Sequence, residues 1–321
     1  MEEMQASDGR TMYYGKDDVF VYRTYARPLT VRPIPESTWT GEDGVIFAHR
    51  ITFAAGGDAF FSSFAEGDNA RIVATDSMKN FILRQAAAYD GATTEGLLAA
   101  LGRRFLDTYA HVGEVKLSAE RLPFEPALLS GADGPAPSGL VYRASRGERL
   151  RAELTLTRIA DGSASLAAQE SGLSELRLIK VSGSSFQGFI RDAYTTLPDS
   201  ADRPLHIELD VGWRYADPED ALDAERGRYV AAAQVRDLAQ QVFHARHSPS
   251  IQHLIWQIGL QLLRRFAQLE EVRFTSANRT WEAVVEPDEG GRAVYTEPRP
   301  PYGFQGLSMT RADLRREEER R

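Results

Sequence analysis

LHIELDVGWRYA (205–216), DPEDALDAERGRYVAAAQVRDLAQQVFHARH (217–247) and SPSIQHLIWQIGLQLLRRF (248–266) follow one another directly in the chain. The first segment alternates apolar and polar residues, which predicts a strand with one buried face. The other two repeat apolar residues at helical spacing, and Ser248-Pro249 is typical of a helix start. A strand followed by two helices is expected where helices cover one face of an antiparallel sheet.

The same order of elements is expected in both halves of the chain: two strands, two helices, two strands. The first half has expected strands at 17–26, 44–55 and 113–124, an expected hairpin or long strand at 140–159, and expected helices at 78–90 and 93–111. The second half adds expected strands at 174–185, 270–274 and 281–287. Asp76 or Ser77 is the expected N-cap of the first helix. The repetition predicts an α+β fold built by duplication.

This pattern divides the chain into four parts. We expect a leader at 1–11, a first unit at 12–160, a second unit at 161–300 and a charge-dense C-terminal tail at 301–321. The glycine-rich segments 56–70 and 128–139 are expected to be loops. The uncovered face of such a sheet is either solvated or buried by oligomerisation, and the strand patterns fit both.

The composition excludes several classes of function. The chain has 321 residues, 42% of them hydrophobic and 26% charged, which is typical of a globular protein. The formal net charge of −8 disfavours nucleic acid as a partner, and no apolar run is long enough for a membrane span. With no cysteine, the chain has neither disulfides nor thiolate metal sites. We expect a cytoplasmic location, since the chain ends in EERR rather than a peroxisomal signal.

Polar side chains stand in four stretches where elements are expected to begin or end. Each has an ordinary explanation. Lys16 fits a solvated strand edge, and Thr75 and Asp76 fit helix capping. Phe186 and Arg203, which flank a long polar segment, fit a core residue and a surface charge, and Gln252 fits an exposed first turn of a helix. The pair of histidines in HARH (244–247) is too weak a signal for a metal site.

Taken together, the four stretches resemble the urate oxidase (uricase) family, which is built from tandem T-fold units. The matching segments are YGKDDVFVYR (14–23), VATDSMKN (73–80), SSFQGFIRDAYTTLPDSADR (184–203) and SPSIQ (248–252). The resemblance spans roughly residues 13 to 300, with the segments in the family's order and spacing. It implies oxidation of urate by O₂ and water to 5-hydroxyisourate and hydrogen peroxide, with no metal or organic cofactor. It also implies a homotetramer with active sites at subunit interfaces.

The resemblance implies how this chain would hold a purine anion. Phe186 would stack on the ring, because an aromatic face offers contact area at little entropic cost. Arg203 would donate two hydrogen bonds, one to a carbonyl oxygen and one to a ring nitrogen of the purine. The carboxamide of Gln252 would form hydrogen bonds with the opposite edge of the ring. Backbone N–H groups would bind the remaining ring atoms, and the family places them at Thr75, Asp76 and Ile251.

The resemblance also implies a proton relay with one departure from the family pattern. Lys16, as a buried neutral amine, would take a proton from Thr75. Asn278, within TSANRTW (275–281), would hold O₂ or water above the ring, in a break between two expected strands. Two residues further on, many family members have a histidine, whereas this chain has Thr280. A hydroxyl can donate and accept, but it has no pKa near neutrality, so Thr280 in this catalytic position cannot act as a histidine does. Either Lys16 and Thr75 suffice, with Thr280 and water relaying protons, or the activity is reduced.

Two other functions fit the same residues less well. A catalytically weak T-fold protein that binds purine or pterin-like ligands would use Phe186, Arg203 and Gln252, but it would have little use for Lys16. A purely structural protein, in which the duplication only assembles a tunnel, would not explain why Phe186, Arg203 and Gln252 occur together.

Overall fold

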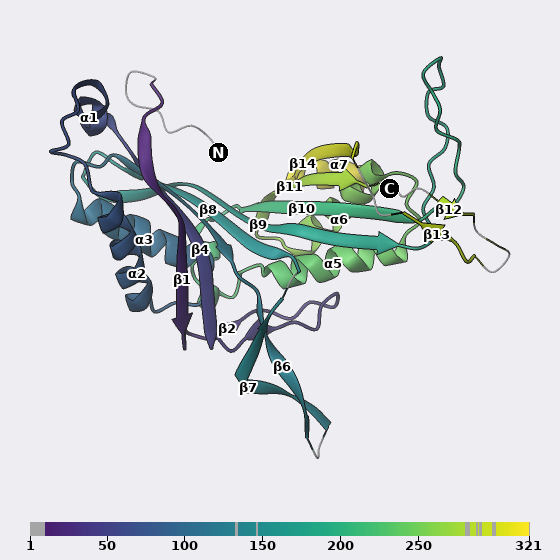
Figure 1. Cartoon of the computed structure of the whole chain (residues 1–321), viewed down its shortest axis with the longest axis horizontal. Helices are drawn as coiled ribbons and strands as arrows, with labels where there is room; N and C mark the ends of the chain where they lie inside the picture. The colour runs from purple at the N-terminus through teal and green to yellow at the C-terminus, as the bar shows by residue number, and fades with distance from the viewer. Residues whose placement is uncertain are drawn as a thin grey trace. The chain divides into compact units, whose positions relative to one another are not determined.

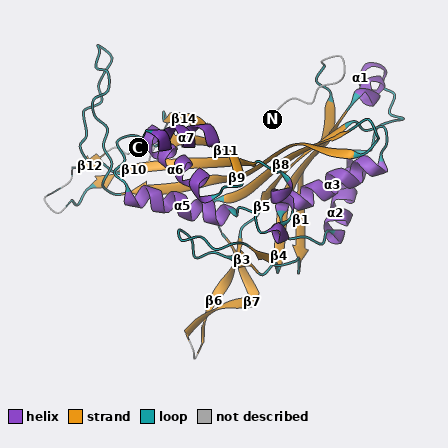
Figure 2. Cartoon of the chain, turned by 180° about the vertical axis from the view of Figure 1, so that it is seen from behind, coloured by secondary structure: helices purple, strands orange, loops and turns teal. Residues whose placement is uncertain are grey.

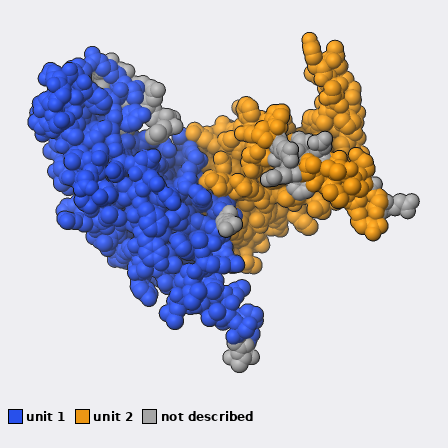
Figure 3. Space-filling model, in the orientation of Figure 1, with its two compact units in different colours: residues 1–32, 40–172, 214–230 blue, residues 33–39, 173–213, 231–321 orange. Residues whose placement is uncertain are grey.

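The computed structural model describes residues 10–131, 134–145, 147–279, 283–286, 288, 291–296 and 300–320. Its contacts divide the chain into two compact units (Figure 3). Unit 1 comprises Met1–Arg32, Thr40–Gly172 and Arg214–Val230, and unit 2 comprises Pro33–Trp39, Leu173–Trp213 and Ala231–Arg321. No helix in the described part of the chain is long and apolar enough to cross a membrane.

Unit 1 is an antiparallel sheet covered on one face by two helices (Figure 1). The strands, in sheet order, are β1 (Tyr13–Thr24), β4 (Ile46–Gly56), β5 (Glu114–Arg121), β8 (Arg149–Arg158) and the first part of β9 (Ala164–Lys180). The helices are α2 (Thr75–Ala88) and α3 (Thr94–Thr108). Val19 and Val21 of β1 are buried, whereas Phe20 and Tyr22 on its other face are half exposed. The strict alternation explains how one strand serves both a core and an open face.

Two expected loops of unit 1 contain regular structure, so these predictions were wrong. Segment 56–70 contains a 3₁₀ turn, η1 (Asp58–Phe60), and the short helix α1 (Phe61–Glu66), because Phe60 is fully buried against the Tyr14 ring. Segment 128–139 lies in a hairpin of β6 (Phe124–Gly131) and β7 (Gly134–Ala144), which projects away from α2 and α3 (Figure 2). Backbone pairing stabilises this hairpin despite its prolines. The remaining short elements are β2 (Leu29–Thr30), β3 (Gly41–Glu42), α4 (Glu219–Leu222) and η2 (Ala224–Arg226).

Unit 2 repeats the arrangement of unit 1. Its sheet runs from the end of β9 through β10 (Leu205–Tyr215) and β11 (Leu269–Asn278) to β14 (Gly303–Thr310). The helices α5 (Ala232–Ala245) and α6 (Ile251–Arg265) pack on each other, and α6 packs on β11 and β14. The expected helical segment 217–247 is instead broken, because Gly227 adopts a left-handed conformation (φ 67°) after η2. The α+β class and the duplication are confirmed.

The C-terminal segment of unit 2 is largely structured. All eight residues of β14, which were expected in the tail, pair with β11 from Glu271 to Asn278. Helix α7 (Arg311–Glu319) follows at once, and Thr310 and Asp313 form a capping box at its start. The two short strands β12 (Ala283–Val285) and β13 (Val294–Tyr295) pair with each other.

A cationic side chain binds the C-terminal carbonyl groups of each of the four large helices. Arg23, near the end of β1, donates to Ala86 and Tyr89 at the end of α2. Arg158 ends β8 and caps α3, Lys180 ends β9 and caps α5, and Arg311 follows β14 and caps α6. Positive charge is favourable at this end of a helix. The two caps of unit 1 and the two caps of unit 2 occupy corresponding strands, so the duplication extends to individual side chains.

Candidate active site

A cavity of about 140 Å³ in unit 2 gathers five of the residues predicted from the sequence. Its walls come from the β9–β10 connection, the start of α6, the end of β11 and the middle of β14. The lining residues are Ser185, Phe186, Leu197, Arg203, Leu205, Ser250, Ile251, Gln252, Asn278 and Gln305. The cavity therefore combines an aromatic ring, one cation and three carboxamides.

The β9–β10 connection folds back on itself and brings Phe186 and Arg203 together. The backbone of Phe186 exchanges two hydrogen bonds with Ser200, of 2.9 and 3.1 Å, and the N–H of Arg203 donates to Ser184 at 2.8 Å. As a result, the guanidinium carbon of Arg203 lies 5.3 Å from the centre of the Phe186 ring. Phe186 also stacks on Phe189, with 4.9 Å between ring centres and 13° between planes. The ring is thus held in a fixed orientation by its neighbours.

Arg203 has an unsatisfied hydrogen-bond donor. Its Nε atom is buried and has no hydrogen-bond partner among the residues that the structure describes. Burial also lowers the pKa of this guanidinium below its usual range, although the group stays charged at neutral pH. A buried N–H without an acceptor costs about 1–3 kcal/mol, which an anionic ligand would recover through a charge-assisted bond.

The first turn of α6 supplies further donors to the cavity. Ser250 is the N-cap, and its hydroxyl accepts the N–H of His253 at 3.1 Å. Ile251 and Gln252 follow at the first two helical positions, where backbone N–H groups have no acceptor within the helix. The Ile251 side chain is buried, while that of Gln252 is exposed and free to turn toward a ligand.

Asn278 and Gln305 complete the cavity from two paired strands. Asn278 is the last residue of β11, so the expected break in TSANRTW comes after Asn278. Gln305 was missed by the sequence analysis. It shares the inward face of β14 with Leu307 and buried Met309, and a polar residue in that alternation was the available signal. The Gln305 Oε1 accepts the hydroxyl of buried Ser276 at 2.9 Å, which leaves its amide N–H groups for the cavity.

The other lining residues missed from the sequence are Ser185, Leu197, Leu205 and Ser250. They had no distinguishing signal, because serine and leucine are common in loops and strands. Thr280, which replaces the family histidine, lies outside the described residues.

Unit 1 holds the three other predicted site residues, and none of them lines the cavity. Lys16 lies half-buried on β1 beside a bulge in the pairing with β4. Thr75 and Asp76 are exposed and open α2, which is joined to β1 by a 2.8 Å hydrogen bond from the Val73 N–H to the Tyr14 hydroxyl.

The start of α2 differs from the sequence prediction. The N-cap is Ala74, and no side chain caps the helix, so the prediction of Asp76 or Ser77 as N-cap was wrong. Asp76 instead accepts from Lys79 at 2.7 Å, and this contact, with a smaller contribution from the charge of Lys16, lowers the pKa of the carboxyl. The helix therefore begins earlier than predicted, with its first backbone N–H groups uncapped by any side chain.

In the described part of the chain, no group of three or more histidine, aspartate or glutamate side chains is arranged to hold a metal ion. This includes the histidines of HARH.

Comparison with known proteins identifies the family. The Uricase family model matches residues 12–148 and 169–305, one range for each tandem repeat. This chain belongs to the uricase family. Its fold is accordingly the tandem T-fold.

Individual uricases resemble the chain over nearly its whole length. It is 49% identical over 313 residues to the uric acid degradation bifunctional protein PucL of Bacillus subtilis, covering 97% of this chain and 63% of that protein. It is 50% identical over 304 residues to the uricase of Halalkalicoccus jeotgali, covering 94% and 99%. The crystal structure of a uricase from Bacillus fastidious superposes with a TM-score of 0.94 at 49% identity, covering 96% of each chain. The chain spans 63% and 61% of the length of the two Bacillus bifunctional proteins that it matches.

Proposed function

We propose that this uricase-family chain oxidises urate with O₂ and water to 5-hydroxyisourate and hydrogen peroxide, without a metal or an organic cofactor. The observation that carries the proposal is the buried, unpartnered Nε of Arg203 beside the Phe186 ring, in a cavity that also contains Gln252. A planar anion with adjacent oxygen and nitrogen acceptors matches this set of groups.

Each residue of the cavity has a distinct part in binding. Phe186 stacks against the purine, and Arg203 donates two parallel hydrogen bonds to one edge. Gln252 pairs its carboxamide with the opposite edge, and the Ile251 N–H binds a ring acceptor. Asn278 binds O₂ or the water that follows it.

The remaining groups come from a neighbouring subunit. Lys16, Thr75 and Asp76 belong to unit 1, whereas the cavity is lined entirely by unit 2. In a homotetramer, the exposed start of α2 on one subunit closes the cavity of another, and the uncapped N–H groups of Thr75 and Asp76 meet the ligand. The half-exposed Phe20 and Tyr22 on the open sheet face of unit 1 are then covered by assembly.

The reaction needs proton transfer and electron transfer but no further oxidant. Lys16 and Thr75 together carry away the proton that leaves urate or water. The electron-rich purine gives two electrons to O₂, which leaves with two protons as hydrogen peroxide. Water adds to ring carbon 5 and yields 5-hydroxyisourate. Thr280 relays protons together with water, but it does not act as the acid or base that a histidine would be, because its hydroxyl does not titrate near neutrality.

The alternative is a catalytically weak T-fold protein that binds purine or pterin-like ligands in the same cavity. Loss of urate absorbance in air, with chelator-treated protein, distinguishes the two functions. We expect steady loss at low protein concentration, whereas no loss at high concentration would exclude the oxidase. Lys16→Met should reduce turnover severely while leaving urate binding under nitrogen nearly intact. Thr280→His should raise turnover if the missing histidine limits the rate.

Mixing two inactive variants tests whether the sites span subunits. Lys16→Met chains retain Arg203, and Arg203→Met chains retain Lys16. Co-assembly should restore activity if the two residues act from different chains, and light scattering should give the mass of a tetramer. Activity that stays at the level of the separate variants would place both residues in one chain. The cytoplasmic location remains a prediction, testable by fractionation of the source cells.

A further inference from the structure

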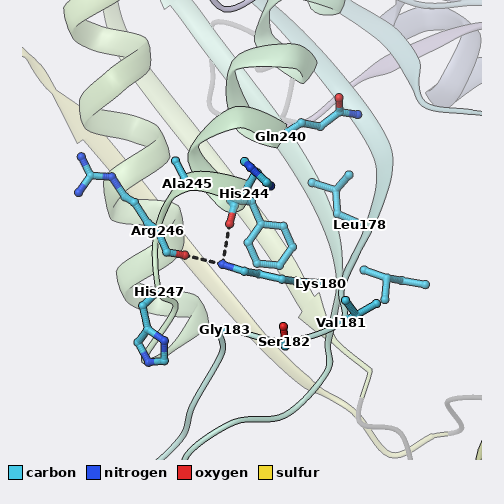
Figure 4. A pocket seen from close by; sticks show the side chains of 12 residues that line it. Leu178, Lys180, Val181, Ser182, Gly183, Gln240, His244, Ala245, Arg246 and His247 are labelled. Atoms are coloured by element: carbon cyan, nitrogen blue, oxygen red, sulfur yellow. Dashed lines mark hydrogen bonds between the residues drawn. The ribbon is translucent and has the colours of Figure 1, made fainter. Parts of the chain in front are cut away.

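His247 approaches the candidate active site from a second cavity. This cavity, of about 660 Å³, lies between the end of β9 and the end of α5. Figure 4 shows His247 at one end of it, with the imidazole directed away from the Lys180 ammonium. The Nε2 atom of His247 lies 2.8 Å from the hydroxyl oxygen of Ser185. Ser185 also lines the active-site cavity, directly before Phe186.

This contact connects an exposed, titratable ring to the wall of the substrate pocket. The backbone fixes the geometry, because the Ser185 N–H donates to Ser248 at 3.0 Å and the Ser248 N–H donates to Gly183 at 3.0 Å. His247 directly precedes Ser248, so the imidazole and the hydroxyl stand on two paired segments.

The direction of this hydrogen bond depends on the proton at Nε2. A protonated imidazole can only donate, so the Ser185 hydroxyl then accepts and keeps its own proton for the pocket. A neutral imidazole with its proton on Nδ1 accepts from Ser185, which then turns oxygen lone pairs toward the pocket. The first state favours an anionic ligand, and the second disfavours it.

We propose that His247 is a positioning residue that sets, through Ser185, whether this edge of the active-site cavity donates to the substrate or accepts from it. The inference rests on the proposed function, because that function identifies the ligand as a purine anion. It gives the chain a titratable histidine one hydroxyl away from the substrate, although Thr280 occupies the family's histidine position.

Several charged or titratable groups lie near His247. Lys180, His244 and Arg246 line the same cavity. Lys180 donates to the carbonyl groups of Phe243 and Arg246, at 2.8 and 2.5 Å, and is held there as the cap of α5. The Asp202 carboxylate accepts the N–H of Gly183 at 2.6 Å and lies on the Ser185 side.

The test is urate binding under nitrogen between pH 6 and 9, measured by calorimetry on the full-length protein. His247→Gln keeps a hydrogen-bonding side chain that does not titrate. We expect the ratio of the His247→Gln dissociation constant to the wild-type dissociation constant to change about fivefold across this pH range. A change of this size corresponds to the contribution of one hydrogen bond to binding. His244→Gln, in the same cavity but without a contact to Ser185, is the matched control and should show a constant ratio. In air, the effect should fall on KM rather than on kcat.

Ser185→Ala shows whether the hydroxyl transmits the effect. In that background, His247→Gln should no longer change the pH dependence of binding. A ratio that does not vary with pH in the wild-type background would overturn the proposal. So would a pH-dependent ratio that persists without the Ser185 hydroxyl, because the imidazolium charge would then act directly on the anion.

Two measurements separate this inference from the proposed function. Oxidation of urate in air tests the function, whereas binding under nitrogen requires no turnover. If urate does not bind, NMR titration of the His247 imidazole still tests the contact without a ligand. Ser185→Ala should shift the pH at the midpoint of the His247 titration. An unchanged midpoint would refute the proposed coupling between His247 and the Ser185 hydroxyl.

Discussion

Replacement of Arg203 by methionine should weaken urate binding without destabilising the protein. In the proposed complex, the guanidinium donates to the purine anion, and a pair of charge-assisted bonds is worth about 3 kcal/mol after desolvation. The dissociation constant under nitrogen should therefore rise roughly 150-fold. The unfolding temperature, by contrast, should stay close to that of the wild type or rise. The variant removes a buried Nε that has no hydrogen-bond partner in the described structure, which offsets the loss of about 1 kcal/mol from the contact with Phe186.

Calorimetric titration and thermal unfolding measure the two effects on the same preparations. The variant should unfold within about 3 °C of the wild type or above it. Arg103→Met is the control, because Arg103 on α3 forms a half-exposed 2.8 Å ion pair with Glu219 on α4 and does not line the cavity. Arg103→Met should change neither the dissociation constant for urate nor the unfolding temperature appreciably. The reasoning fails if Arg203→Met binds urate within threefold of the wild type, or if its unfolding temperature falls by more than about 5 °C.

Three further predictions concern groups outside the Phe186–Arg203 pair. Gln305→Leu should lower the unfolding free energy by about 2 kcal/mol, because buried Ser276 loses its acceptor, and should weaken urate binding; unchanged thermal stability would contradict this. Arg158→Met should cost about 2 kcal/mol in chemical denaturation, since Arg158 donates to the last carbonyl groups of α3; a loss below 0.5 kcal/mol would show that water replaces it. Burial raises the pKa of Glu95, so its stabilising contribution is present below the ordinary glutamate pKa and is lost as pH rises through the folded value. The stability of Glu95→Gln relative to wild type should therefore rise from pH 5 to pH 8, and a constant difference would count against the raised pKa.

The sequence predicted the elements whose pattern is local. The alternation in β10 and the helical periodicity of α6 come from residues a few positions apart, and both elements occur where expected. The helix expected over 217–247 forms only in part, as α5, because the chain turns at Gly227. The β6–β7 hairpin was not predicted, because glycine and proline are typical of loops and only cross-strand backbone bonds stabilise it. The start of α2 was misplaced for a similar reason. Capping residues were available at Asp76 and Ser77, but Asp76 binds Lys79 instead.

The residues of the candidate site also fall into those that the sequence predicted and those that only the structure revealed. Phe186, Arg203 and Gln252 could be predicted because the motifs around them resemble those of the uricase family, although each residue by itself has an ordinary structural explanation. Gln305 could not, since its importance depends on the pairing of β14 with β11 and on the Ser276 hydroxyl. The contact of His247 with Ser185 was equally inaccessible, because the two residues are far apart in sequence and meet through a short backbone pairing.

The sequence by itself determined the α+β class and the duplication, and its resemblance to the uricase family supplied the residues that we propose bind a purine anion. Periodicity and side-chain chemistry are properties of nearby residues, so they can be read without knowledge of the fold. Only the tertiary structure decided that unit 2 gathers Arg203, Ile251 and Asn278 around one cavity while Lys16 and Thr75 stand together in unit 1. It also decided that the Arg203 Nε is buried without a partner among the described residues. Burial and pairing depend on which distant segments pack together, and no local pattern in the sequence specifies that.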